Sequence, residues 1–158
     1  GNRSPATRGR RVLLAMIVAS TLAGIAANAV RGTTGRTRPE AARKGITPGW
    51  YGLRHDGQWL VGRNRYNSFP SGHSATAAGF FGVLLFLRRP VPFLVGLMCL
   101  IPVPLARLMM NQHHLSDVVV GSAVGLFVAG WVWTRWSLPM DGWWMRTLGH
   151  RVVRRNAP

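Results

Sequence analysis

The sequence predicts an all-α protein, an integral membrane helical bundle with about four spans in this chain. Long uncharged apolar stretches separate the arginines, and 47% of the 158 residues are hydrophobic. Acidic residues are scarce, with 4 Asp and Glu against 20 Lys and Arg, and the chain also contains 7 Trp. A soluble helical bundle, the alternative, would be hard to keep in solution with this composition. The length suits a single domain over residues 1–158.

Each span is predicted from its length, because a membrane helix needs about 20 largely apolar residues. The first stretch contains no charge, and we expect a retained span there, not a cleaved signal peptide. The second and third stretches reach this length only with the polar residues at their ends, Ser71–His73 and Arg107–Asn111. The predicted membrane helices are 12–30, 71–87, 91–111 and 115–135.

The remaining segments are predicted to lie outside the bilayer. Residues 31–70 form an extracytoplasmic loop, with short strands or a short helix around Gln58–Val61. Residues 136–158 form an interfacial basic tail, in which tryptophans stand among arginines. The single cysteine, Cys99, lies in an apolar stretch and is expected to be a small buried hydrophobe. This excludes a disulfide framework and a cysteine-based metal site.

The charge distribution bears on orientation and on partners. With four spans, the basic groups at both ends of the chain and at Arg88–Arg89 share one side, which the positive-inside rule makes cytoplasmic. The other side carries 9 of the 20 cations, so counting alone does not settle orientation. An anionic substrate would account for those outer cations. The net charge of +16 is not interpreted as a nucleic-acid-binding surface, because the cations form no single stripe.

Two clusters of polar residues flank the predicted outer loop. Arg31 and Arg38 are separated by six residues that include two glycines, and guanidinium groups bind phosphate oxygens bidentately. Alone, these arginines are better explained as an interfacial anchor. Pro70–His73 then reads Pro-Ser-Gly-His, in which Ser71 suits a helix start and Gly72 lets a backbone N–H approach an anion. An ordinary capped helix start with an incidental histidine is the other interpretation.

The third cluster runs from Arg107 to Asp117. His113 and Asp117 are four residues apart, so on a helix they would share a face and hydrogen-bond. A carboxylate that holds one imidazole nitrogen leaves the other free to attack. A charge beside a span is also costly unless it is paired or functional. The alternatives are a structural His–Asp pair and a pair made by His114.

In order and spacing, the three clusters resemble the signature of the type-2 phosphatidic acid phosphatase family. That signature is Lys-x6-Arg-Pro, then Pro-Ser-Gly-His, then Ser-Arg-x5-His-x3-Asp. Here the parts are Arg31-x6-Arg38-Pro39, Pro70–His73 and Ala106-Arg107-x5-His113-x3-Asp117. Two positions differ, since Arg31 replaces the family lysine and Ala106 the serine. The family core usually has six membrane helices.

The resemblance implies a lipid phosphatase that needs no cofactor and no metal. It implies that His113 is the nucleophile, that Asp117 orients it, and that His73 protonates the leaving oxygen. It further implies a phosphate-binding group of Arg31, Arg38, Ser71, Gly72 and Arg107. A bacterial inner-membrane protein with its active site facing the periplasm would follow.

Several functions are compatible with these residues. Candidate substrates in the bilayer are undecaprenyl pyrophosphate, lipid A phosphate, phosphatidylglycerol phosphate and phosphatidate. Haloperoxidases, in which vanadate takes the place of phosphate, share the site, but they are mostly soluble. A non-catalytic protein that binds anionic lipids through its arginines is a further alternative. It leaves the spacing of His113 and Asp117 unexplained.

Overall fold

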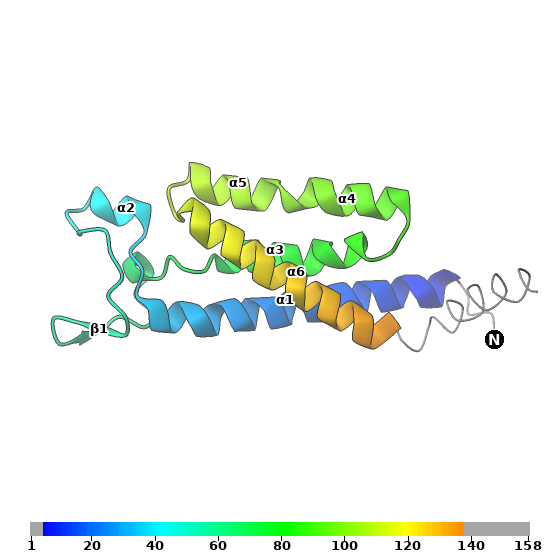
Figure 1. The fold of residues 1–158 in the computed structure, drawn as a ribbon, viewed down its shortest axis with the longest axis horizontal. Coiled ribbons are helices and arrows are strands. Elements are labelled where there is room, and N and C mark those ends of the chain that lie inside the picture. Colours follow the sequence, from blue (N-terminus) through cyan, green and yellow to red (C-terminus); the bar gives the residue numbers. More distant parts are fainter. Residues whose placement is uncertain (1–4, 138–158) are drawn as a thin grey trace, which may run out of the picture.

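A computed structural model describes residues 5–137 of the chain, with side chains from residue 8. Its secondary structure is mainly helical, as predicted (Figure 1). The predicted interfacial tail lies almost entirely outside the described residues. The helices are α1 (Pro5–Thr34), α2 (Pro39–Ala42), α3 (Gly72–Leu85), α4 (Pro90–Leu100), α5 (Pro102–Met109) and α6 (Leu115–Ser137).

Within the described part of the chain, three helical stretches are long and apolar enough to cross a membrane. They are Arg8–Thr34, Pro90–Met109 and Leu115–Trp136. The predicted span 91–111 corresponds to α4 and α5 in succession, because Pro102 begins a new helix where it would otherwise break one. The predicted span 71–87 corresponds to α3, which has 14 residues and is short for a full crossing. The count of four spans therefore stays a prediction.

Helix α3 is the centre of the bundle and packs against α1, α4 and α6. In Figure 1, α3 and α6 both begin at the end of the bundle where the loops gather, whereas α1 and the α4–α5 pair run toward that end. The contact between α3 and α6 is close because α6 presents glycines there. A Cβ on Gly125 would lie 2.3 Å from the carbonyl oxygen of Ala75. Small residues at such contacts are typical of helices that pack within membranes.

The interior consists mainly of small residues, and large apolar side chains point outward. Buried alanines recur along α1, at Ala15, Ala19, Ala23 and Ala27. The exposed large hydrophobic residues of α4, α5 and the residue between them include Val91, Leu94, Met98, Ile101, Leu105 and Met109. This distribution suits a helical bundle surrounded by lipid tails, where apolar surface can face outward without cost.

Residues 35–71 connect α1 to α3 and cover one end of the bundle. They contain α2, a hairpin of β1 (Arg54–His55) and β2 (Gln58–Trp59), and the short 3-10 helix η1 (Asn64–Tyr66). The short strands expected around Gln58–Val61 are therefore present. Gly35 has φ of 58°, and a Cβ there would lie 2.1 Å from the carbonyl oxygen of Gly52. Glycine is needed at this position on both counts.

Candidate active site

The start of α3 forms one side of the candidate site. Ser71 is its N-cap, as predicted, with an extended backbone and a hydroxyl that accepts from the Ser74 N–H at 3.4 Å. The Ser74 hydroxyl donates to the same Ser71 oxygen at 2.9 Å. Gly72 follows Ser71 in the sequence and lies beside Arg31, since a Cβ on this glycine would lie 3.3 Å from Arg31 Nη1. The backbone of the helix start therefore lies directly against a guanidinium group.

The start of α6 forms the opposite side and is joined to the first. Asp117 lies in the first turn of α6, and its Oδ2 accepts from the His114 N–H at 2.8 Å, in the manner of a capping box. Its backbone carbonyl accepts from the Ser71 N–H at 2.9 Å. A Cβ on Gly121, one turn further on, would lie 2.4 Å from the Ser71 carbonyl oxygen. The two helix starts are thus in direct backbone contact.

Three predicted phosphate-binding arginines lie around this contact. Arg31 donates to Asn28 Oδ1, and Arg107 donates to Gln112 Oε1 at 2.5 Å. Arg38 is within electrostatic range of both Arg31 and Arg107. Burial lowers the pKa of Arg38; Glu40 opposes this shift, and the Arg107 charge adds to it. Among the described residues, Arg38 Nε is buried without a hydrogen-bond partner, which an anion would supply.

The two predicted catalytic histidines lie near each other but differ in exposure. His73, in the first turn of α3, is exposed and lies within electrostatic range of Arg107, His113, Arg31 and Arg38. His113 is 3% exposed. All eight residues predicted for the site therefore gather at one end of the bundle. Their chemical roles are a separate question.

The bonding of His113 differs from the prediction. It lies before α6, in the gap between the predicted helices 91–111 and 115–135, where Asn111 adopts a φ of 53° and the chain turns between α5 and α6. Nδ1 lies 2.7 Å from the Ser68 carbonyl oxygen and 3.8 Å from Asp117 Oδ2. The second distance is too long for a hydrogen bond but within ion-pair range, so the two side chains lie farther apart than expected. A carbonyl only accepts, so Nδ1 carries the proton and a neutral His113 has its lone pair on Nε2.

His114 is bonded elsewhere. Its Nε2 lies 3.1 Å from the carbonyl oxygen of Thr37, and only its backbone N–H contacts Asp117. The alternative pair between the His114 ring and Asp117 is therefore not formed. The His114 ring therefore contacts the loop backbone at Thr37, whereas the His113 ring contacts the Ser68 carbonyl.

Two residues of the site were not predicted as part of it. Arg36 donates to Asp117 Oδ1 and to Ser116 Oγ, the latter at 2.8 Å. The Ser68 hydroxyl donates to Asp117 Oδ2 at 2.5 Å. Arg36 lies between Arg31 and Arg38, in a segment that the sequence already singled out. No sequence pattern pointed to Ser68, which lies two residues before Pro70.

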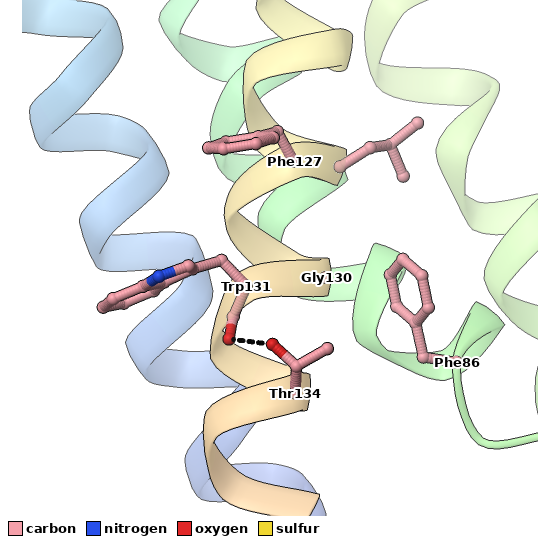
Figure 2. Close-up of a pocket in the computed structure, with 6 residues that line it drawn as sticks. Phe86, Phe127, Gly130, Trp131 and Thr134 are labelled. Atoms are coloured by element: carbon pink, nitrogen blue, oxygen red, sulfur yellow. Dashed lines mark hydrogen bonds between the residues drawn. The ribbon is translucent and has the colours of Figure 1, made fainter.

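The buried polar residues of the described chain share one location. Thr37, Ser68, Ser71, Ser74, His113 and Asp117 all belong to the contacts described above. The pocket drawn in Figure 2 is of another kind: it lies at the other ends of α3 and α6 and is lined by Phe86, Leu126, Phe127, Gly130, Trp131 and Thr134. It contains no titratable side chain. The titratable residues predicted for the site lie instead at the loop-covered end.

Comparison with known proteins identifies the class. The model of the PAP2 superfamily matches residues 12–139, and the chain belongs to this superfamily. It is 33% identical over 129 residues to a lipid A 1-phosphatase of Rhizobium johnstonii, covering 76% of this chain and 49% of that protein. It is 34% identical over 133 residues to a lipid A 1-phosphatase of Rhizobium etli, covering 76% and 51%.

A shorter match of 35% identity over 85 residues is to a lipid A 1-phosphatase of Porphyromonas gingivalis, covering 49% of this chain and 19% of that protein. The chain spans about half the length of the first two relatives. No solved structure matches.

Proposed function

We propose that this chain is a lipid phosphatase whose nucleophile is His113. The observation that carries the proposal is the gathering of Arg31, Arg38 and Arg107 around two histidines, with Arg38 Nε buried and unbonded among the described residues. Phosphoryl transfer depends mainly on positioning and on stabilising charge at the phosphate oxygens. Three guanidinium groups and the start of α3 supply both.

The reaction proceeds in two steps. Nε2 of His113 bonds to phosphorus while the bond from phosphorus to the lipid oxygen breaks, and His73 gives that oxygen a proton. Water then attacks phosphorus, His73 takes its proton, and the bond from nitrogen to phosphorus breaks. Inorganic phosphate leaves and His113 returns to its neutral form. Charge stabilisation is assigned to the arginines, so the proposal requires no metal.

The proposed substrate is a phosphorylated membrane amphiphile, with lipid A phosphate as the first candidate. The curated relatives at 33% and 34% identity bear the name lipid A 1-phosphatase. A site at the end of an apolar bundle suits a substrate whose tails lie among the helices while its phosphate reaches the loops. We place the protein in a bacterial inner membrane with this end facing the periplasm.

Phosphate release from a panel of lipids in detergent tests the proposal. The panel contains lipid A, undecaprenyl pyrophosphate, phosphatidylglycerol phosphate and phosphatidate. We expect release from lipid A to be the fastest, unaffected by EDTA and inhibited by vanadate. Activity lost in EDTA and restored by a divalent metal would contradict the metal-free mechanism. Halide oxidation activated by vanadate would favour the haloperoxidase alternative.

A further inference from the structure

Asp117 is enclosed by donors from three separate segments of the chain. Its side chain is fully buried. Oδ1 accepts from Arg36, whereas Oδ2 accepts from the Ser68 hydroxyl at 2.5 Å and the His114 N–H at 2.8 Å. Because a buried carboxylate is costly unless paired, this set of partners explains how the charge is tolerated. The His113 ring stays 3.8 Å from Oδ2, within ion-pair range but beyond hydrogen-bond distance.

Ser68 is the residue that connects Asp117 to His113. Its hydroxyl donates to Asp117 Oδ2, while its carbonyl oxygen lies 2.7 Å from His113 Nδ1. Its own N–H donates to the Arg36 carbonyl oxygen at 3.0 Å. Ser68, Arg36 and Asp117 therefore form a closed ring of contacts, because the Arg36 side chain returns to Asp117. The Ser68 carbonyl that contacts His113 is therefore held in place by the hydrogen bonds of the Ser68 hydroxyl and the Ser68 N–H.

Arg36 is itself held in place by the loop. Its guanidinium group lies 4.6 Å from the centroid of the Trp50 ring, and the two residues form a β-bridge through their backbones. The Trp50 ring packs edge-on against Phe69 at 5.1 Å, and Phe69 follows Ser68. The segment that carries Ser68 is thus packed against the aromatic ring that covers Arg36.

We propose that Asp117 acts on the nucleophile through Ser68, and that Ser68 and Arg36 are positioning residues that fix the His113 tautomer. This inference rests on the proposed function for its kinetic part. The Ser68 carbonyl holds the proton on Nδ1 and leaves Nε2 free to attack phosphorus. Asp117 anchors Ser68 through the hydroxyl, and Arg36 pairs with Asp117 and holds it in place.

A double-mutant cycle in phosphate release tests the connection. Ser68→Ala keeps the carbonyl but removes the hydroxyl, so the segment loses its anchor. We expect kcat to fall about 10²-fold, as for a misplaced reacting group, while KM changes little. Asp117→Asn should lower kcat by a similar factor, and the kcat of the double variant should be no lower than that of the poorer single variant. If the two losses multiply, Asp117 acts on His113 independently of Ser68 and the proposal is wrong.

Matched variants separate positioning from general damage. Ser20→Ala removes a partly buried hydroxyl contact between α1 and α3, a bond of 3.1 Å to the Thr76 carbonyl, and should keep full activity. Arg36→Lys keeps the charge and should retain more activity than Arg36→Gln. This pair also tests the ring of contacts if Ser68→Ala does not fold. Equal loss in both Arg36 variants would contradict the proposal.

The tautomer of His113 gives a readout that needs no activity. In ¹⁵N NMR of histidine-labelled protein, with His113→Gln to assign the signal, we expect a neutral ring protonated on Nδ1. Ser68→Ala and Asp117→Asn should each give a tautomer mixture, and Ser20→Ala should not. An unchanged tautomer in Ser68→Ala would overturn the inference. A protein that releases no phosphate but shows these shifts would refute the proposed function alone.

Discussion

Adjacent histidines in this chain have different surroundings. The His113 ring is held by a buried carbonyl beside the arginines, whereas the His114 ring bonds the Thr37 carbonyl in the loop. His113→Ala should therefore reduce phosphate release by about 10³-fold or more, as expected for a lost nucleophile. His114→Ala keeps the backbone N–H that donates to Asp117, and should retain most activity. An inactive His114→Ala with an active His113→Ala would reverse this assignment.

Arg38 offers a test of the shape of the phosphate site as well as its charge. Arg38→Lys keeps a cation but loses the planar pair of donors, so we expect kcat/KM to fall roughly 10- to 100-fold. Arg54→Lys is the matched control, since Arg54 lies on the exposed hairpin and contacts Gly57 and Trp59. Steady-state kinetics on both variants makes the comparison. Equal activities would mean that Arg38 does not bind the phosphate.

Residue types and spacing were enough to predict which eight residues gather at the site, but not how they are bonded. The contact between Ser68 and His113 spans 45 residues and uses a backbone carbonyl, which any residue type provides. The pair of Arg36 and Asp117 spans 81 residues. Such contacts depend on how the loop folds over the bundle, and no local pattern specifies them. The proposed catalytic roles stay predictions.

At the scale of the helices, Gly121 determines how closely α6 approaches the start of α3. Gly121→Ala would place a Cβ 2.4 Å from the Ser71 carbonyl oxygen, and rigid backbone cannot move aside cheaply. We expect a loss of about 1–3 kcal/mol in stability and a clear drop in activity. Gly130→Ala on the same helix meets only the tip of the Phe86 ring, at 3.1 Å, and should be nearly neutral. Thermal unfolding in detergent compares them, and equal melting temperatures would contradict the packing argument.

The helices predicted from apolar length are present in the structure, but some of them begin or end at other residues than predicted. The stretch 91–111 reads as one span by composition, but Pro102 divides it into α4 and α5. The predicted bounds left His113 between the helices 91–111 and 115–135, and α6 does begin at Leu115. The expected hydrogen bond between His113 and Asp117 assumed a shared helix face, but the left-handed conformation of Asn111 turns the chain before His113. Hydrophobicity does not report such backbone turns.

For the whole molecule, the proposed orientation can be tested with introduced cysteines. Lys44 lies exposed in the loop beside α2, and Arg89 lies exposed before α4. In a Cys99→Ser background, Lys44→Cys should react with an impermeant maleimide in intact spheroplasts. Arg89→Cys should react only after the membrane is permeabilised. The opposite labelling would place the candidate site in the cytoplasm.

The parallel arrangement of α3 and α6 has an electrostatic consequence for the substrate. Because both helices begin at the same end of the bundle, the positive ends of two backbone dipoles lie at the end where we propose that the phosphate binds. Part of the attraction for an anion is therefore built into the backbone and is insensitive to side-chain replacement. The return segment α4–α5 is what allows two successive helices to point the same way. Loss of any one arginine should weaken phosphate binding in this protein without abolishing it.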